Sequence, residues 1–514
     1  MLRIGVDVGG TNTDAVLMDG RRIVHAVKRP TTRDVTGGLM SALRDVLADT
    51  EVSAAEVALV VIGTTHFTNA VIQRRGLSPT AVVRLCLPAA QSLPPMIDWP
   101  ESLAREIGEH IFLAHGGMEF DGTPISHFDE REIRAIGAEI RVRGLRAIAV
   151  TGIFATVRAE FEREAARILA ESCPEASITV SADIGQLGLL ERESATILNS
   201  ALLALACETV AALRAGVREC GLACPMFLSQ NDGTLLDAAQ AERFPVLTFA
   251  SGPTNSMRGA AFLSGLGEAI VLDVGGTTTD VGLLHGAFPR NATTTVDVGG
   301  VRTNFRMPDV FSIGLGGGSI VVSDATRLEI GPRSVGCDLP KLARVFGGEV
   351  LTATDIAVAA GRARIGDPAH VAGLDPGLIG RCWARIEAQL ASAVDRARLS
   401  PEPIPVLAVG GGSILVPERL AGLEVVRPEN FAIANAVGAA IAQVAGEVDR
   451  VYSLDTLSRE QALDEAESEA RRKAVAMGAI EHSITVTERE DVPLAYLRGN
   501  ATRVRVKVVG EMRI

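Results

Sequence analysis

The stretch Asp7-Val-Gly-Gly-Thr-Asn-Thr-Asp14 occurs a second time, almost unchanged, as Asp273-Val-Gly-Gly-Thr-Thr-Thr-Asp280. Aligning residues 7–20 with residues 273–286 gives nine identities in fourteen positions, so chance is a poor explanation. Apolar residues precede and follow each copy, which predicts a strand, a tight glycine turn and a second strand in both places. The sequence therefore predicts two related hairpins at distant points of the chain.

The residue types inside the two turns are typical of phosphate binding. Glycine allows the backbone to approach a ligand closely, and consecutive turn N–H groups form a concavity that binds anions. The candidate ligand-binding residues are Gly9, Gly10, Thr11 and Thr13 in the first turn, and Gly275, Gly276, Thr277, Thr278 and Thr279 in the second. We predict that the two turns hold a nucleoside triphosphate from two sides. The alternative is a pair of ordinary hairpin turns, where Asp and Gly are also common.

The carboxylates at the entrance to each turn need a separate explanation. Asp7 and Asp273 would repel phosphate, so they predict a hard cation such as Mg²⁺ held through water. Either carboxylate is alternatively suited to orienting an attacking nucleophile. Asp7 and Asp273 are therefore the candidate catalytic and metal-binding residues.

The composition indicates a soluble globular protein with about three domains. The chain has 514 residues, 47% hydrophobic and 22% charged, and its net charge of −12 argues against binding to nucleic acid. The apolar stretch from Ala195 to Gly216 contains charged residues and is interpreted as a buried core helix, with no membrane span expected. The chain enters a strand at once, which leaves no room for a signal peptide. Seven scattered cysteines favour reduced thiols and a cytoplasmic location.

The pattern of apolar runs predicts four parts: residues 1–184 as an α/β domain, 185–265 as a mainly helical segment, 266–447 as a second α/β domain and 448–514 as a small α+β tail. In the first part we expect strands at 57–62 and 147–150, and helices at 30–48 and 129–143. In the tail, the capping-box spacing of Ser458 and Gln461 predicts a helix to about Met477. Strands are expected at 483–488 and 502–509.

Several familiar catalytic motifs are absent from the sequence. It has no Gly-Lys-Ser/Thr phosphate loop, no completed Gly-x-Gly-x-x-Gly, no His-Glu-x-x-His and no Gly-x-Ser-x-Gly. Cys220 and Cys224 are four residues apart but lack a second pair of zinc ligands. The small-residue helix beginning at Asn435 is suited to close packing against a backbone or an adenine ring, and equally to simple helix–helix packing.

Two Asp-Gly-Thr hairpins followed by a Gly-Gly-Gly turn resemble the actin / sugar kinase / Hsp70 superfamily. More closely, the chain is similar to the hydantoinase A / 5-oxoprolinase family, in a short form. The phrases that carry the resemblance are residues 7–14, 63–70, 116–122, 251–253, 273–280, 316–319, 331–334 and 435–440. The resemblance implies two actin-like (ribonuclease H-like) α/β domains around an ATP cleft, with a helical insert and the small tail.

The resemblance also implies a reaction and a set of sites. It implies ATP-dependent opening of a cyclic amide, such as a hydantoin or 5-oxoproline, through a phosphorylated amide, with ATP and Mg²⁺ as cofactors. Gly410, Gly411 and Gly412 match the turn that holds the nucleoside, and Gly63, Thr64, Thr65 and Asn69 match a candidate substrate turn. Asn12 and residues 336–341 depart from the family pattern, so the individual substrate does not transfer.

Other functions use the same kind of cleft. The alternatives are a small-molecule kinase, a carboxylase subunit and a nucleotide-gated assembly protein, which differ in the fate of the γ-phosphate. No base or metal cluster for opening a ring is visible, so we expect a second hydantoinase-type subunit as partner; association into a homo-oligomer is left open. The strand at 502–509 is either an edge for that partner or part of a closed small sheet.

Overall fold

The computed structural model describes residues 1–31, 35–48, 50–292, 295–324, 327–455, 457–495 and 500–513. Its first sheet has the order β10-β9-β4-β1-β2-β3. The first three strands form an antiparallel meander, and β4 and β9 continue the sheet in parallel with β1. The strands are β1 (Leu2–Val8), β2 (Asn12–Asp19), β3 (Arg22–Pro30), β4 (Val57–Thr64), β9 (Met226–Ser229) and β10 (Leu235–Asp237).

A second sheet repeats this arrangement, with the order β13-β12-β11-β19-β21-β20 and β16 paired to β12. Its first two strands are antiparallel, and β19 and β21 run parallel to β11. The strands are β11 (Ala269–Val274), β12 (Thr279–His285), β13 (Phe288–Pro289), β16 (Val310–Ile313), β19 (Val406–Val409), β20 (Arg419–Leu420) and β21 (Leu423–Val426). The shared order, with the third and second strands on one side of the first and two parallel strands on the other, is the ribonuclease H-like arrangement that the resemblance implies.

Two helices join the sheets at the centre of the molecule, α8 (Ser251–Ser264) and α12 (Ala434–Ala440). Their apolar faces pack against β11 and β19 on one side and against β2 on the other. A Cβ on Gly438 would lie 1.8 Å from the carbonyl oxygen of Asn255, and one on Gly259 would lie 1.9 Å from that of Ala434. The small residues of α12 therefore allow the backbones of α8 and α12 to pack closely, which is the helix–helix packing that the sequence offered as one interpretation.

Four further helices pack around the first sheet. They are α1 (Val35–Ala48), α2 (His66–Gln73), α6 (Leu189–Glu219) and α7 (Ala238–Arg243). Helix α6 is long and apolar enough to cross a membrane by length and composition, but 67% of its most apolar window is buried inside the fold, as expected for a core helix. The helix predicted at 30–48 is shorter, because Pro30 ends β3; residues 32–34 of that prediction lie outside the described residues.

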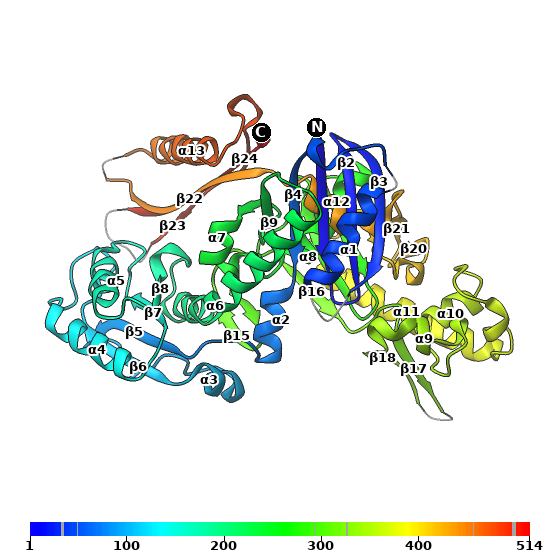
Figure 1. The fold of residues 1–514 in the computed structure, drawn as a ribbon, viewed down its shortest axis with the longest axis horizontal. Helices are drawn as coiled ribbons and strands as arrows, with labels where there is room; N and C mark the ends of the chain where they lie inside the picture. Colours follow the sequence, from blue (N-terminus) through cyan, green and yellow to red (C-terminus); the bar gives the residue numbers. More distant parts are fainter. Residues whose placement is uncertain are drawn as a thin grey trace.

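Two lobes extend from opposite sides of this centre (Figure 1). One is a parallel sheet in the order β6-β5-β7-β8 with helices packed on its faces. It contains β5 (Thr80–Leu87), β6 (His110–His115), β7 (Ala147–Gly152), β8 (Ser177–Val180), α3 (Glu101–Ile107), α4 (Glu130–Val142) and α5 (Glu160–Ser172). The other contains the hairpin β17 (Ser319–Ser323) and β18 (Leu328–Ser334), with α9 (Leu339–Leu342), α10 (Ala353–Ala359) and α11 (Pro376–Ala397). A short hairpin, β14 (Val296–Val298) and β15 (Val301–Thr303), packs against α6.

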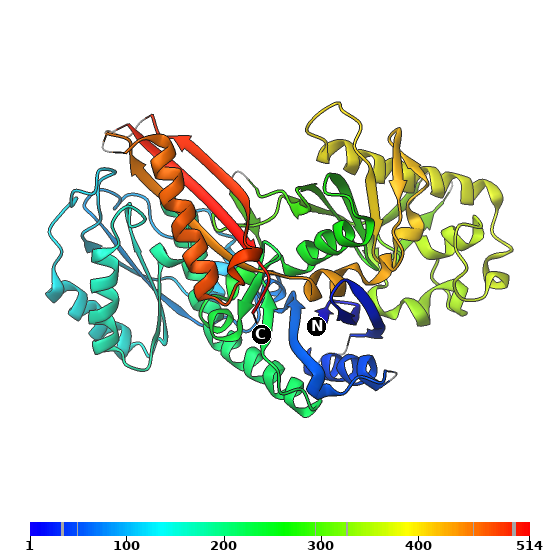
Figure 2. The same ribbon diagram turned by 90° about the horizontal axis from the view of Figure 1, so that it is seen from above.

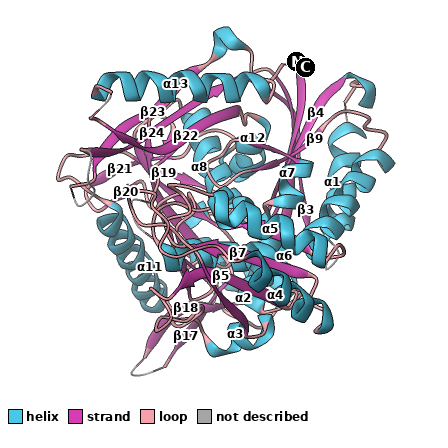
Figure 3. Ribbon diagram, turned by 90° about the vertical axis from the view of Figure 1, so that its left-hand side faces the viewer, coloured by secondary structure: helices cyan, strands magenta, loops and turns pink. Residues whose placement is uncertain are grey.

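The C-terminal residues form a three-stranded antiparallel sheet covered by one helix (Figures 2 and 3). The sheet consists of β22 (Val444–Ser453), β24 (Ala501–Gly510) and β23 (Thr485–Pro493), and its apolar face packs on α13 (Arg459–Ala476). Ser458 and Gln461 form the predicted capping box at the start of α13. Strand β24 pairs on both sides, so the interpretation of residues 502–509 as an edge for a partner is wrong. The two strands that flank it both come from this C-terminal module.

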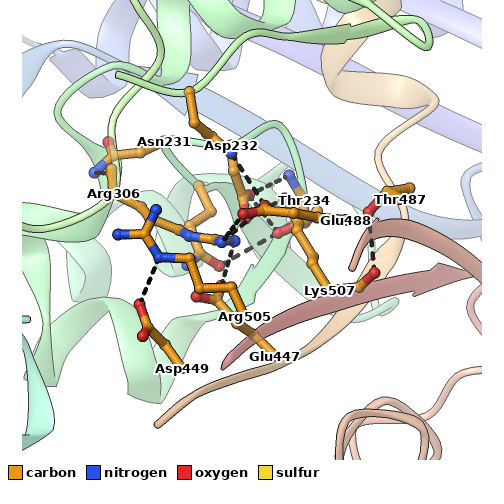
Figure 4. Close-up of polar contacts among 12 residues, drawn as sticks. Asn231, Asp232, Thr234, Arg306, Glu447, Asp449, Thr487, Glu488, Arg505 and Lys507 are labelled. Atoms are coloured by element: carbon orange, nitrogen blue, oxygen red, sulfur yellow. Dashed lines mark hydrogen bonds and ion pairs between the residues drawn. The ribbon is translucent and has the colours of Figure 1, made fainter. Parts of the chain in front are cut away.

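The opposite face of this sheet docks on the body through charged side chains, shown in Figure 4. Lys507 Nζ lies 2.6 Å from Asp232 Oδ2 in the turn between β9 and β10, and both side chains are buried. Arg306 pairs with Glu447 at 3.0 Å and with Glu488 at 2.7 Å. We call the set the docking network; its members are Asp232, Arg306, Glu447, Asp449, Glu488, Arg503, Arg505 and Lys507. The sheet is therefore joined to the body by these ion pairs in addition to the apolar cluster that it shares with Leu59, Val61 and Leu235 of the body.

Candidate functional site

The two repeated turns face each other across one cavity of about 620 Å³. In the first hairpin Asp7 lies opposite Asp14, and Gly9 N donates to Asn12 O at 3.1 Å. In the second, Asp273 lies opposite Asp280, and Gly275 N donates to Thr278 O at 2.9 Å. A Cβ on Gly276 would lie 3.5 Å from the Thr11 hydroxyl, so the two turns are neighbours. The sequence repeat is thus a repeat in space, with two equivalent turns around one volume.

Most of the predicted site residues line this cavity. They are Asp7, Gly9, Gly10, Thr11, Thr65, Asp273, Gly275, Gly276, Thr277, Thr278, Gly410, Gly411 and Gly412. The Gly-Gly-Gly turn meets the second hairpin closely, since Gly412 N donates to Val274 O at 2.7 Å. A second glycine turn braces the same hairpin from the other side, with Gly317 N donating to Gly275 O at 3.0 Å. Two segments distant in sequence therefore fix the second turn.

Two of the predicted threonines do not face the cavity. Thr13 and Thr279 are fully buried; the Thr13 hydroxyl lies 3.3 Å from that of Thr31, and the Thr279 hydroxyl donates to Leu315 O at 2.6 Å. Thr13 is the second residue of β2 and Thr279 is the first residue of β12, and the residues on both sides of each threonine line the cavity. Because side chains alternate along a strand, these two hydroxyls point to the opposite face and their assignment to the ligand is corrected.

The candidate substrate turn is only partly at the cavity. Thr65 lines it, whereas Gly63, Thr64 and Asn69 do not. A Cβ on Gly63 would lie 2.8 Å from Asp7 Oδ1, so this glycine makes room for the carboxylate. Asn69 Nδ2 donates to the Thr65 hydroxyl at 3.3 Å. These three residues support the lining from behind, and the start of α8, at Gly252 and Pro253, takes their place beside Thr65.

Four carboxylates project into the cavity, the two predicted ones and Asp14 and Asp280, which end the repeated phrases. Burial raises the pKa of Asp7 to about 7, with Asp14 adding repulsion, and burial raises that of Asp280 to about 6. The pKa values of Asp14 and Asp273 are also raised, again chiefly by burial. The cavity therefore stores negative charge at a cost that a bound cation would remove.

Side chains from elsewhere hold the two entrance carboxylates in place. Asn435 Nδ2 donates to Asp7 Oδ2 at 3.2 Å, and the Ser256 hydroxyl donates to Asp273 Oδ2 at 2.5 Å. Lys28 Nζ lies 2.6 Å from Asp14 Oδ2. The sequence pattern does not point to Lys28 or Ser256, because each is brought to its carboxylate only by the fold. Asp14 and Asp280 could have been predicted, because they end the two repeated phrases.

Among the described residues, no three His, Cys, Asp or Glu side chains lie close enough together to hold one metal ion directly. The donor set nevertheless fits a hydrated divalent cation, because the four carboxylates surround a single volume and Asp14 Oδ1 is buried without a partner. Mg²⁺ keeps several of its waters in such sites. The predicted Mg²⁺ held through water is consistent with this arrangement and stays a prediction.

Two sequence profiles match the chain, the hydantoinase/oxoprolinase N-terminal region over residues 3–173 and hydantoinase/oxoprolinase over residues 192–367. The two ribonuclease H-like sheets around one phosphate-type cavity define the broad class, an actin-like ATPase fold. Within it, the chain belongs to the hydantoinase/oxoprolinase family, as the resemblance indicated.

Two curated relatives carry out different chemistry. Caprolactamase subunit alpha of Pseudomonas jessenii is 26% identical over 388 residues, which is 70% of this chain and 54% of the relative. The acetophenone carboxylase gamma subunit of Aromatoleum aromaticum is 27% identical over 399 residues, 70% of this chain and 53% of the relative. The chain spans about half the length of these relatives.

Solved structures confirm the fold. The ATP-dependent caprolactamase from Pseudomonas jessenii matches with a TM-score of 0.79 at 20% identity, covering 99% of this chain and 88% of that chain. A nucleotide-free acetone carboxylase matches with a TM-score of 0.71 at 16% identity, covering 100% of this chain and 88% of that chain. The predicted fold class, two actin-like α/β domains around a cleft with a small α+β tail, is therefore correct.

Proposed function

We propose that this chain is an ATP-dependent enzyme that opens a small cyclic amide, such as a hydantoin, 5-oxoproline or a related lactam. The observation that carries the proposal is the pair of equivalent glycine turns on two sides of one cavity lined by four carboxylates. Family membership and the caprolactamase relative support the same reaction class. The chain spans about half the length of these relatives, and we propose that it has the same kind of activity.

In the proposed reaction the amide oxygen attacks the γ-phosphorus of ATP, the bond from that phosphorus to the β,γ-bridging oxygen breaks, and ADP leaves. Water then adds to the activated carbon, the C–N bond breaks as the nitrogen takes a proton, and a second water releases phosphate from the resulting acyl phosphate. Phosphorylation is needed because an amide carbon is otherwise a poor electrophile. Most of the protein's contribution is positioning and electrostatic stabilisation, as in other phosphoryl transfers.

The residues have separate tasks in this scheme. The backbone N–H groups of Gly9, Gly10, Gly275 and Gly276, with the hydroxyls of Thr11 and Thr277, bind phosphate oxygens. Asp7 and Asp273 hold the waters of a Mg²⁺ ion, which supplies neutralisation of the triphosphate charge when bound. Gly410, Gly411 and Gly412 hold the nucleoside, and the substrate lies toward Thr65 at the start of α2.

A second candidate is the ATP-using subunit of a carboxylase. The acetophenone carboxylase relative favours it, because it is as similar to this chain as the caprolactamase subunit is. Both reactions would use ATP to form a phosphorylated intermediate. In the first, water attacks the carbon of the phosphorylated amide. In the second, ATP phosphorylates bicarbonate, and a substrate carbon that has lost its proton attacks the carboxyl carbon, so that the bond to the phosphate oxygen breaks and phosphate leaves.

We also propose that ring opening needs a second hydantoinase-type subunit. The relatives are named as subunits alpha and gamma, and among the described residues the cavity lining contains no histidine, while its four carboxylates already have a task at the cation. All seven cysteines are free thiols, which supports a reducing cytoplasmic setting. Whether the chain also forms a homo-oligomer is measured directly by light scattering.

The test is an ATPase screen of the purified chain over hydantoins, 5-oxoproline and lactams, with and without a co-expressed partner subunit and with mass analysis of products. Free phosphate accompanied by an opened ring supports the hydrolase. A stable phosphorylated product identifies a kinase, and bicarbonate-dependent carbon addition identifies the carboxylase. Failure of the chain to bind ATP under any of these conditions overturns both candidates.

A further inference from the structure

Lys28 is the one cationic side chain among the described residues that line the cavity. It lies in β3 directly opposite Asp14 in β2, and its Nζ is 2.6 Å from Asp14 Oδ2. The lysine side chain is 36% exposed while that of Asp14 is 8% exposed, so the ammonium group lies at the boundary between a buried carboxylate and the cavity. It faces the volume where the proposed function needs positive charge.

The choice of lysine at this position is informative. Of the 50 Lys and Arg residues only four are lysines, Lys28, Lys341, Lys473 and Lys507. An ammonium group is a compact point charge with three donors, whereas a guanidinium is a planar fork. A chain that otherwise uses arginine has lysine here, in a cavity crowded by two glycine turns.

Asp14 holds the lysine but does not saturate it. One donor of the ammonium group satisfies Asp14 Oδ2, which leaves two donors for a ligand. The other carboxylate oxygen, Asp14 Oδ1, is buried without a partner and so remains available to a cation or water. Lys28 lines the cavity together with both hairpins, and its charge partly opposes the rise in pKa that burial causes at Asp7 and Asp273.

We propose that Lys28 binds the terminal phosphate of ATP and stays with that phosphoryl group as it moves to the acceptor oxygen, and that Asp14 is the positioning residue for Lys28. The proposal rests on the proposed function of the cavity. During transfer the bond from the γ-phosphorus to the ADP oxygen breaks and the bond to the acceptor oxygen forms. Lys28 keeps its proton throughout, because its task is to stabilise charge on the equatorial oxygens.

The location of Lys28 indicates that it contacts the terminal phosphate rather than another part of the nucleotide. The lysine belongs to the first sheet, beside the hairpin of Asp7 and Asp14. The Gly410–Gly412 turn, to which we assign the nucleoside, follows β19 of the second sheet. A nucleotide held at that turn and extending across the cavity reaches the first hairpin, and therefore Lys28, with its last phosphate.

The test compares ADP with a non-hydrolysable ATP analogue, each with Mg²⁺, by titration calorimetry on the full chain. For Lys28→Met we expect the affinity for the analogue to fall about ten- to a hundredfold, since a charge-assisted contact is lost, while that for ADP changes by less than about twofold. Turnover of ATP should fall on the order of 10²–10³-fold. Lys28→Arg keeps the charge and the pairing with Asp14 and should not restore turnover, whereas Asp14→Asn should give an intermediate loss.

The matched control is Arg29→Met. Arg29 is the next residue of β3, is 48% exposed and pairs with Asp45 at 2.6 Å, away from the cavity lining. It should leave both affinities and turnover unchanged. Equal weakening of ADP and the analogue in Lys28→Met, or turnover like that of the Arg29→Met control, overturns the role of Lys28 at the terminal phosphate. Failure of the unmodified chain to bind either nucleotide instead overturns the proposed function.

Discussion

The cavity and the docking network each bring together four buried or partly buried carboxylates, yet the two regions neutralise them differently. In the cavity four aspartates face a single lysine, Lys28. In the docking network four carboxylates face four cations, and each carboxylate has a pairing partner within 3.0 Å. One region is left negative in the unliganded chain, and the other is balanced by the chain itself.

The pKa values follow this difference. Burial raises the pKa of Asp7, Asp14, Asp273 and Asp280 in the cavity. Burial acts in the same direction on Asp232 in the docking network, but Lys507 and hydrogen bonds from Thr234 outweigh it and lower its pKa. In the same network burial raises the pKa of Glu447 despite Arg306, so pairing outweighs burial at Asp232 but not at Glu447. Carboxylates that outnumber the cations beside them therefore indicate where a ligand cation belongs, whereas carboxylates matched by cations indicate a structural joint.

The largest expected effect is on stability and concerns the docking network. Lys507→Met should cost about 3–5 kcal/mol in the free energy of unfolding of the C-terminal sheet, because it leaves Asp232 buried without a counter-ion. Urea unfolding and hydrogen exchange of β24 amides measure the loss. Lys341→Met, in an exposed pair with Asp338, is the control. A loss below about 1 kcal/mol would mean that this pair does not hold the sheet.

The next effect is on activity and concerns the cavity. Asp273→Asn should lower ATP turnover on the order of 10²–10³-fold, because a contact that positions the cation is removed. Its stability should be unchanged or higher, since the pKa of Asp273 is raised by burial and the ionised group is costly in the fold. Steady-state phosphate release and thermal unfolding measure both quantities. Asp98→Asn, in an exposed pair with Arg302, is the control, and turnover above about a tenth of normal would count against the site.

A smaller effect is the dependence of turnover on pH. If Asp7 must be ionised to hold the cation, kcat/KM should fall about tenfold for each pH unit below its pKa of about 7. The same protonation favours the folded state, because a carboxyl whose pKa is raised on folding binds its proton more tightly when folded. The loss between pH 7 and pH 5 should therefore occur without unfolding. A flat profile over this range would show that Asp7 is not required as a carboxylate.

Features that lie within one short segment of the chain could be predicted from the sequence. Both hairpins, their facing glycines and the carboxylates at their entrances lie within single eight-residue phrases, so their pattern predicts them directly. The same alternation of side chains that placed Asp14 and Asp280 in the cavity removes Thr13 and Thr279 from it. That correction was within reach of the sequence, once the strands were known to begin at Asn12 and Thr279.

The parts that depend on distant segments were not predictable in this way. Lys28 was missed because β3 ends at Pro30, where the sequence predicted the start of a helix. Ser256 reaches Asp273 only because α8 packs between the two sheets. Likewise, alternation predicts the strand at 502–509 but not its neighbours, and only the topology shows that β24 is central. Strand order and helix placement are properties of the whole chain, and no single segment encodes them.

The smallest expected effect is that of removing both charges of the buried pair. Asp232 Oδ1 accepts from Thr234 N at 3.0 Å and from the Thr234 hydroxyl at 2.6 Å, and an asparagine keeps that oxygen. Asp232→Asn combined with Lys507→Met should therefore cost only about 1 kcal/mol or less, because replacing both members of a buried ion pair is often nearly neutral. A double-mutant cycle with the two single variants measures the coupling energy.

This result would separate two explanations of the docking network. If the large cost of Lys507→Met comes from an unpaired buried carboxylate, the second substitution recovers most of it. If the cost comes from the lost contact between the Lys507 ammonium group and the ring of Phe288, whose centroid lies 5.6 Å from Nζ, the double variant stays as unstable as the single one. The same cycle on Asp14 and Lys28 should give the opposite result, with little effect on stability and a strong coupling in turnover. We expect this contrast because the excess negative charge of the cavity is neutralised by the bound ligand and its cation, whereas that of the docking network is neutralised by the chain.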